Sequence, residues 1–184
     1  IDILGEPSNL AEIEIILATT TTLGRIGFKN FEIRINERRI LKAMAAYAGF
    51  EESDYDSIFI TLDKMDKIGL EGVSAELLEA GYSKDSIDKY VNLFTALNGV
   101  KDPSEGMDVL LDKLGQYLEP SVANWMKEIA TAVNATKEAE FELVFDPTLV
   151  RGMSYYTGTI FEIAIPEFGG SCGGRRCLRF GGSC

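Results

Sequence analysis

The sequence predicts an α+β protein in which a block of helices is inserted into a small sheet. Residues 31–36, FEIRIN, alternate apolar and charged side chains, which is the pattern of a half-buried strand. Residues 38–139 contain amphipathic helical patterns separated by short turns, and strand-like composition returns at residues 141–145 and 155–165. Strands on both sides of a run of helices indicate that the helices interrupt a sheet-based domain.

The first residues predict the end of a strand followed by a helix. Residues 1–4, IDIL, have strand-like composition, and residues 5–7 contain the glycine and proline of a turn. Asn9 and Glu12 have the spacing of a capping box, which marks a helix start. A chain that begins within a strand is expected to be a fragment of a longer protein. The apolar positions and closing glycines of this helix are Leu10, Ile13, Ile16, Leu17, Leu23, Gly24 and Gly27.

Helix starts in the central block are marked by capping residues and by one proline that suits a first helical position. These residues are Ser53, Ser83, Ser104 and Pro120. Each predicted helix carries an apolar stripe, which we interpret as core packing rather than as a cofactor pocket. The stripes comprise Ile58, Phe59, Leu62 and Met65; Ile87, Tyr90, Val91 and Phe94; Met107, Leu110, Leu111 and Leu114; and Val122, Trp125, Met126 and Ile129. The acidic residues between them are most simply solvated helix faces.

Composition excludes several classes of function. The chain has 18 Lys and Arg against 29 Asp and Glu, a net charge of −11, which argues against a dedicated nucleic-acid-binding module because such a module needs a basic face. Its 184 residues include no histidine, which excludes Ser/His and Cys/His nucleophilic machinery and every His-ligated metal site. No apolar run approaches the ~20 residues of a membrane span and no leader opens the chain, so we expect a soluble, cytoplasmic protein.

The three cysteines lie near the end of the sequence, in the glycine-rich stretch 168–184. Cys172, Cys177 and Cys184 lack a fourth Cys or a His to close a zinc site, so free thiols and no metal are expected. The same stretch contains several arginines and no acid, and a glycine loop beside arginines can hold a phosphate through backbone amides. It lacks the Lys-Ser/Thr ending of a P-loop, and a flexible tail is the simpler interpretation.

Residues 149–162, LVRGMSYYTGTIFE, are the strongest candidate for a functional segment. Arg151 is a permanent cation whose planar fork suits a carboxylate or a phosphate. The run from Tyr155 onwards predicts a strand that pairs with residues 141–145 as an antiparallel hairpin around Arg151. Neighbouring strand side chains face opposite ways, so only one of Tyr155 and Tyr156 is expected to face a site. A surface stack of arginine on tyrosine explains the same residues equally well.

The string R-G-x-x-Y-Y-T-G within this segment resembles a signature of the histidyl-tRNA synthetases. Two further stretches are similar to that family: residues 1–14 resemble its segment after the second class II motif, and residues 31–41 resemble its next strand and helix. The resemblance implies part of a class II antiparallel catalytic sheet. It divides the chain into a catalytic segment at 1–40, a helical insertion domain at 41–138 and a return to the sheet at 139–184.

The resemblance also implies roles for individual residues. Arg151 matches the arginine that stabilises negative charge while the histidine carboxylate attacks the ATP α-phosphate, and Asp2 with Tyr156 matches the pair that contacts the imidazole, with Tyr155 in the same pocket wall. The glycine-rich stretch matches a possible substrate loop, formed by Gly170, Ser171, Gly173 and Gly174. By the same resemblance the parent enzyme uses ATP and Mg²⁺, binds tRNA(His) and is a homodimer, with no membrane partner.

The sequence departs from the family pattern in ways that limit the expected activity. Ser154 stands where aspartate is frequent, and the likeness ends after Gly174. The first class II motif, the arginine-bearing part of the second, the third motif and the anticodon-binding domain have no counterpart. We therefore expect the chain alone to be an inactive fragment that holds no cofactor. Two alternatives stay open: a synthetase-like regulatory subunit of ATP phosphoribosyltransferase, and a helical interaction module without activity.

Overall fold

The computed structural model describes residues 3–150, 158–165 and 170–176, and within these ranges the chain is α+β, as predicted. Two single-turn 3₁₀ helices, Glu52–Asp54 and Gly115–Tyr117, connect longer elements. The helices are α1 (Leu10–Arg25), α2 (Arg38–Ala48), α3 (Tyr55–Leu62), α4 (Met65–Glu79), α5 (Lys84–Ala96), α6 (Pro103–Leu114) and α7 (Pro120–Thr136); the strands are β1 (Phe31–Glu37), β2 (Phe141–Phe145), β3 (Thr159–Ile165) and β4 (Gly170–Arg176).

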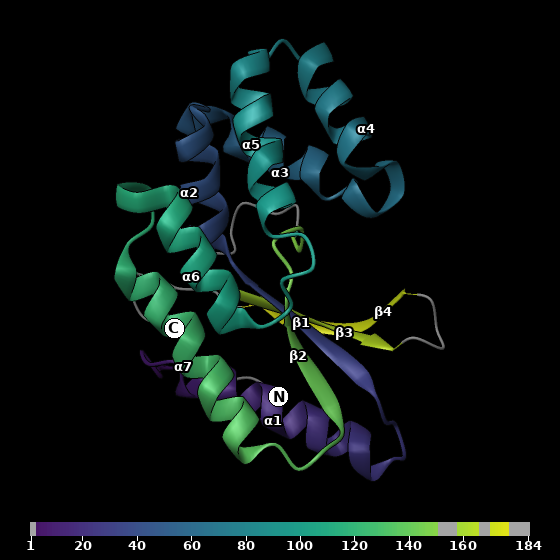
Figure 1. Ribbon diagram of the computed structural model, residues 1–184. Helices are drawn as coiled ribbons and strands as arrows, with labels where there is room; N and C mark the ends of the chain where they lie inside the picture. Colours follow the sequence, from purple (N-terminus) through teal and green to yellow (C-terminus); the bar gives the residue numbers. More distant parts are fainter. Residues whose placement is uncertain (1–2, 151–157, 166–169, 177–184) are drawn as a thin grey trace.

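The strands form one mixed sheet in the order β2-β1-β3-β4 (Figure 1). β1 pairs in parallel with β2 and antiparallel with β3, and β3 pairs antiparallel with β4. The prediction that residues 141–145 pair with the following strand as a hairpin is wrong, because β1 lies between them. Parallel neighbours need a long crossover connection, and α2 to α7 provide one between β1 and β2.

Two predictions about the ends of the chain also need correction. Residues 170–176 form strand β4, so this part of the glycine-rich stretch is not a flexible tail. Backbone pairing does not depend on large side chains, and the free edge of β3 supplies the partner for these glycines. At the other end, Ile3 and Leu4 belong to no strand, and Leu4 is 92% exposed.

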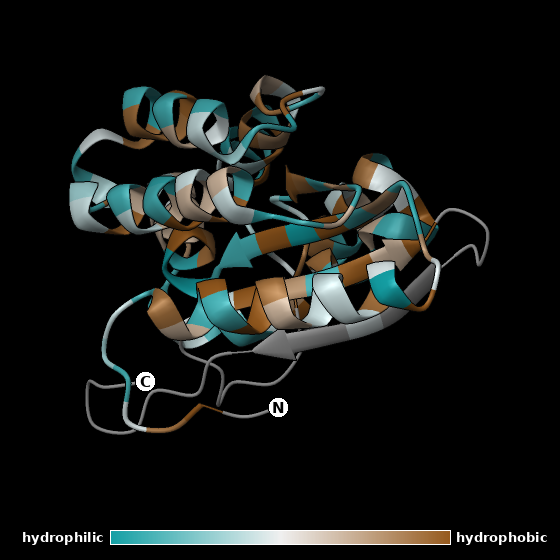
Figure 2. Cartoon of the chain, turned by 90° about the horizontal axis from the view of Figure 1, so that it is seen from below, coloured by the Kyte–Doolittle hydropathy of each residue, from teal (hydrophilic) through white to brown (hydrophobic). Residues whose placement is uncertain are grey.

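The alternating pattern of β1 determines which face of the sheet is buried. Phe31, Ile33 and Ile35 are completely buried, whereas Glu32 and Arg34 on the opposite face are partly exposed. Their cross-strand partners continue the apolar face, since Ile33 pairs with Leu143 on β2 and with Ile163 on β3. The helices carry hydrophilic and hydrophobic residues in alternation along their lengths (Figure 2), as helices that pack on one side do.

The helices form two groups around the sheet. α1 packs along α7, and α7 packs on α6, whose contact with β2 brings this group against the sheet edge. α3, α4 and α5 gather beyond the end of the sheet, and α2 joins them to it through α5 (Figure 1). The predicted block of amphipathic helices is thereby confirmed, whereas the domain boundaries after residues 40 and 138 stay predictions.

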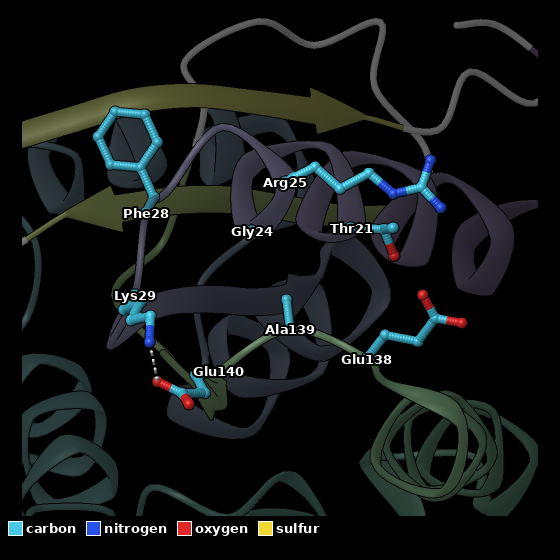
Figure 3. A pocket seen from close by; sticks show the side chains of 8 residues that line it. All are labelled: Thr21, Gly24, Arg25, Phe28, Lys29, Glu138, Ala139 and Glu140. Atoms are coloured by element: carbon cyan, nitrogen blue, oxygen red, sulfur yellow. Dashed lines mark ion pairs between the residues drawn. The ribbon is translucent and has the colours of Figure 1, made fainter.

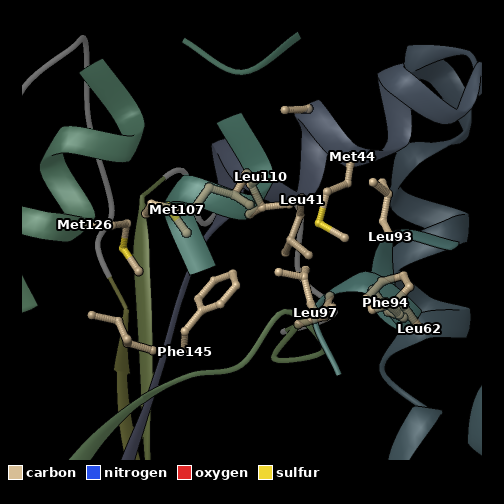
Figure 4. Packing of buried hydrophobic residues seen from close by; sticks show 14 of the residues in the cluster. Leu41, Met44, Leu62, Leu93, Phe94, Leu97, Met107, Leu110, Met126 and Phe145 are labelled. Carbon is tan, nitrogen blue, oxygen red and sulfur yellow. The ribbon is translucent and has the colours of Figure 1, made fainter. Parts of the chain in front are cut away.

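Buried apolar side chains form one continuous core across both groups. Phe145 of β2 lies beside Met107 of α6 and Met126 of α7, and the cluster continues through α2 to Leu93 and Phe94 of α5 (Figure 4). The methionine and aromatic stripes of the helices therefore are core, as the sequence predicts. Gly106 of α6 makes this packing possible, because a Cβ at this position would lie only 2.5 Å from Cδ1 of Phe145.

The local signals of helix starts vary in accuracy. Ser83 caps α5 by accepting a hydrogen bond from the Ser86 amide, and Pro120 occupies the first turn of α7. α6 starts earlier than Ser104, because Asp102 is the N-cap. α3 starts at Tyr55, after a 3₁₀ turn that contains Ser53.

Asn9 is the N-cap of α1, but its side chain makes no capping hydrogen bond. Its amide instead donates to Oε2 of Glu128 on α7, at 2.7 Å. The side chain predicted to cap α1 therefore links the start of this helix to α7 instead. Across the described parts of the chain, no helix has the length and apolar character needed to span a membrane.

Candidate functional site

The residues that sequence analysis assigns to histidine recognition lie mostly outside the described ranges. This applies to Asp2, Arg151, Tyr155 and Tyr156, so their roles stay predictions. The residues of the possible substrate loop lie in strand β4 rather than in a loop, paired with β3; these are Gly170, Ser171, Gly173 and Gly174. Their role toward a substrate is also a prediction. What the structure describes is the framework on either side of residues 151–157.

That framework is built around residues 36–39, the point where β1 ends and α2 begins, which we call the β1–α2 junction. Glu37 is the last residue of β1 and the N-cap of α2, and its side chain accepts a hydrogen bond from the Arg39 amide. This local capping bond explains why the helix starts here without a connecting loop. Asn36 and Glu37 are both completely buried, which is rare for polar residues and requires partners.

The Glu37 carboxylate has one side-chain partner within the junction and one on β3. Oε1 accepts from Nε of Arg39 at 3.0 Å, and Oε2 accepts from the Thr159 hydroxyl, also at 3.0 Å. Thr159 is itself 1% exposed and is the direct cross-strand partner of Glu37 on β3. A buried carboxyl group with both oxygens hydrogen-bonded is strongly constrained in direction. The first residue of β3 is therefore fixed against the end of β1.

The junction also holds the chain just before residue 151. Nδ2 of Asn36 donates to the Leu149 carbonyl at 3.1 Å, and Oδ1 of Asn36 accepts from the Glu37 amide at 2.8 Å. On the other side, the backbone amide of Arg38 donates to the Gly158 carbonyl at 3.2 Å. Three consecutive junction residues thus bind the chain on both sides of residues 150–157.

The two arginines of the junction point into the helical block. Arg38 forms an ion pair with Asp56 at 2.7 Å and lies 5.3 Å from the centre of the Phe59 ring, which joins it to α3. The guanidinium of Arg39 lies 5.7 Å from the ring centre of Trp125 on α7. The junction therefore connects the flanks of residues 150–157 with two helices of the block.

Sequence analysis missed Asn36, Glu37 and Thr159, although a signal was present. Glu37 follows Phe31, Ile33 and Ile35 at the spacing of the apolar face, where the strand pattern calls for another apolar side chain. A carboxyl group at such a position predicts a buried polar partner. Which residue would be that partner depends on the β1–β3 register and could not be read from the sequence.

A separate pocket of about 230 Å³ lies at the other end of β1 (Figure 3). It is formed between the end of α1 and the chain that enters β2, and Lys29 and Glu140 form an ion pair across its rim at 3.9 Å. Both partners are largely exposed, so the pair contributes little to stability. Within the described ranges, no group of three His, Cys, Asp or Glu side chains is arranged to hold a metal ion.

Comparison with known proteins identifies the class to which this framework belongs. The family model described as histidyl-tRNA synthetase matches residues 1–175. The histidine–tRNA ligase of Leifsonia xyli subsp. xyli is 41% identical over 184 residues, which cover 95% of this chain and 40% of the relative. The chain thus spans about two fifths of the length of that relative.

Solved structures agree at the level of the fold. The crystal structure of histidyl-tRNA synthetase from Nostoc sp. PCC 7120 superposes with a TM-score of 0.73 at 22% identity, covering 92% of this chain and 39% of that one. A protein from Bacillus halodurans described as an ATP phosphoribosyltransferase regulatory subunit/histidyl-tRNA synthetase gives 0.72 at 20% identity, covering 91% and 42%. Together with the family match, these findings establish an aminoacyl-tRNA synthetase-like α+β chain. The chain belongs to the histidyl-tRNA synthetase family.

Proposed function

We propose that the chain is the histidine-recognition part of a longer histidine–tRNA ligase, here called the parent ligase. The observation that carries this proposal is the family match over residues 1–175, together with 41% identity to a histidine–tRNA ligase. The parent ligase joins histidine to ATP as histidyl-adenylate, releases pyrophosphate and transfers the histidyl group to tRNA(His). The remaining class II motifs and the anticodon-binding domain belong to other parts of the parent.

In this proposal the segment 151–157 provides the charge and the recognition groups of the reaction. The histidine carboxylate attacks the ATP α-phosphate in its ionised form, so the step requires no general base, and Arg151 stabilises the negative charge that develops. Asp2 and Tyr156 hydrogen-bond the imidazole, and Tyr155 lines the same pocket. Apolar amino acids of similar size are rejected because they would leave these polar groups unpaired once water is excluded from the bound side chain.

ATP and Mg²⁺ are assigned to the parent ligase rather than to this chain. The described residues offer no cluster of metal ligands, and Mg²⁺ would be held with ATP by other parts of the parent ligase. The net charge of −11 also disfavours a broad tRNA-binding face on this chain. We therefore place most contacts with tRNA(His) elsewhere in the parent ligase, which we propose to be a cytoplasmic homodimer of class II architecture.

Histidine-dependent ATP–pyrophosphate exchange tests the proposal. We expect exchange by the parent ligase and only background exchange by the 184-residue chain, because the ATP side of the site lies outside it. Exchange with tyrosine or phenylalanine in place of histidine is the specificity control. A parent protein that folds but shows no histidine-dependent exchange would contradict the proposed ligase function.

One alternative has a specific observation behind it. The Bacillus halodurans protein with the same fold is described both as a regulatory subunit of ATP phosphoribosyltransferase and as a histidyl-tRNA synthetase. A regulatory subunit would bind histidine without forming aminoacyl-tRNA. Charging of tRNA(His) by the parent ligase separates the two functions, since only a ligase attaches histidine to the tRNA.

A further inference from the structure

We propose that Asn36, Glu37 and Thr159 are positioning residues for the segment 151–157, and so control histidine recognition without contacting the substrate. The inference rests on the function proposed above, which places Arg151 and the two tyrosines of this segment at the histidine. It is carried by hydrogen bonds among described residues that lie on either side of the segment.

One short piece of chain holds both flanks of the segment. The Asn36 side chain holds the carbonyl of Leu149 at 3.1 Å, and the Glu37 side chain holds the hydroxyl of Thr159 at 3.0 Å. Asn36 and Glu37 are adjacent, and the Oδ1 of the first accepts the amide of the second. The entry and the exit of residues 150–157 are therefore set relative to each other by a single rigid unit.

Apolar packing would be the simpler way to fix the start of β3 against the end of β1. Glu37 and Thr159 face each other on the apolar side of the sheet, where β1 and β3 otherwise present isoleucine and phenylalanine. A buried carboxyl group is costly unless it is fully hydrogen-bonded, and an apolar pair of similar volume would stabilise the sheet at least as well. A directional hydrogen bond restricts position in a way that apolar contact does not, which is the property a substrate-binding segment needs.

The proposed reaction is sensitive to the position of the groups that bind histidine. Activation requires the carboxylate and the α-phosphate to be aligned, and a displacement of about 1 Å can reduce the rate by about 10²-fold. Loss of the Glu37–Thr159 hydrogen bond frees the exit of the segment while leaving Arg151 and the tyrosines chemically intact. The effect should therefore fall on histidine, whereas ATP, whose ligands we place largely elsewhere in the parent ligase, should bind as before.

The test replaces Thr159 in the parent ligase. Thr159→Val keeps the shape but removes the hydroxyl, and Thr159→Ser keeps the hydroxyl. For Thr159→Val we expect kcat/KM for histidine in ATP–pyrophosphate exchange to fall by about tenfold or more, with a raised KM for histidine and an unchanged KM for ATP. Thr159→Ser should restore most of the activity. Asn36→Ala gives a second, independent disruption, because it removes the hydrogen bond to the Leu149 carbonyl at the other flank of the segment.

Thr20→Val is the matched control. Thr20 is also 1% exposed, and its hydroxyl donates to the Ile16 carbonyl at 2.8 Å within α1, away from the β1–α2 junction. Both valine variants should lower the thermal midpoint, but only Thr159→Val should raise KM for histidine. The inference is overturned if Thr159→Val and Asn36→Ala fold and show an unchanged KM for histidine. If the unmodified parent ligase shows no histidine-dependent exchange, the proposed function itself fails, which is a different result.

Discussion

Replacement of Tyr90 by phenylalanine is expected to stabilise the protein. Tyr90 of α5 is 1% exposed, and its hydroxyl is buried without a hydrogen-bond partner among the described residues. The ring packs edge-to-face against Phe50 and Phe94, with centroids 5.4 and 5.1 Å apart. Phenylalanine keeps both ring contacts and removes only the unpaired polar group.

The magnitude follows from the two effects of removing one oxygen atom. A buried hydroxyl without a partner costs about 1–3 kcal/mol. The small void left behind costs about 24 cal/mol per Å³, or a few tenths of a kcal/mol. The net gain in the free energy of unfolding should therefore be about 1 kcal/mol, which raises the melting temperature of a chain of this size by about 2–4 °C.

Tyr90 also makes the stability of the fold depend on pH in the alkaline range. Burial raises the pKa of the Tyr90 hydroxyl above its ordinary value of 10.0, so the folded state keeps a proton that the unfolded state releases. The resulting stabilisation is fully present below pH 10 and is lost as the pH rises above that value. Phenylalanine has no proton to release, so Tyr90→Phe avoids this loss, and the stability advantage of the variant should grow at alkaline pH.

Both effects can be measured by urea unfolding of the 184-residue chain and of its Tyr90→Phe variant. Unfolding is followed by circular dichroism at pH 7 and above pH 10. Tyr82→Phe is a matched control, because Tyr82 packs edge-to-face against the same Phe50 ring, with centroids 5.4 Å apart, but is only partly buried. We expect its effect to stay within about 0.5 kcal/mol. A Tyr90→Phe variant that is less stable than the original chain at pH 7 would refute the reasoning.

Three further predictions concern packing, capping and the proposed chemistry. Gly106→Ala should lower the free energy of unfolding by about 1–3 kcal/mol, because the added Cβ would lie 2.5 Å from the Phe145 ring. Thermal or urea unfolding measures this loss, and the additional substitution Phe145→Leu should recover part of it. Asp102→Ala should cost about 1 kcal/mol, because its carboxylate caps α6 by accepting the amides of Ser104 and Glu105, and equal stability of the two proteins would contradict this. Arg151→Ala in the parent ligase should raise the activation barrier by about 3 kcal/mol or more in pyrophosphate exchange, and near-normal exchange would exclude the electrostatic role.

The extent of sequence-based prediction differed between elements for identifiable reasons. β1 and the helical block were predicted because their periodicity is local: residues 31–36 alternate, and Ser83 and Pro120 carry capping information in their own side chains. The hairpin prediction for β2 and β3 failed because strand pairing depends on contacts across more than 100 residues of chain. β4 was missed because a glycine-rich strand has no side-chain pattern and acquires its structure from the edge of β3.

The residues of the candidate site likewise differ in whether the sequence alone could reveal them. The string around Arg151 was recognisable in the sequence as a family resemblance, because a motif consists of particular residue types at fixed spacing; its role in recognition stays a prediction. Asn36, Glu37 and Thr159 were not recognised, since their importance arises from hydrogen bonds between segments that are distant in the chain; Glu37 and Thr159, for example, are 122 positions apart.

The sequence by itself determined the α+β class, the amphipathic helices and the family resemblance, because these depend on local periodicity and on motif composition. Only the tertiary structure decided that β1 is central, that β4 completes the sheet, and that the β1–α2 junction holds both flanks of residues 150–157. The physical reason is that register and buried hydrogen bonds are properties of pairs of segments. In the sequence, Glu37 is only a charged residue at an apolar position of a strand. In the structure it lies opposite Thr159 and hydrogen-bonds to it, beside the segment proposed to recognise histidine.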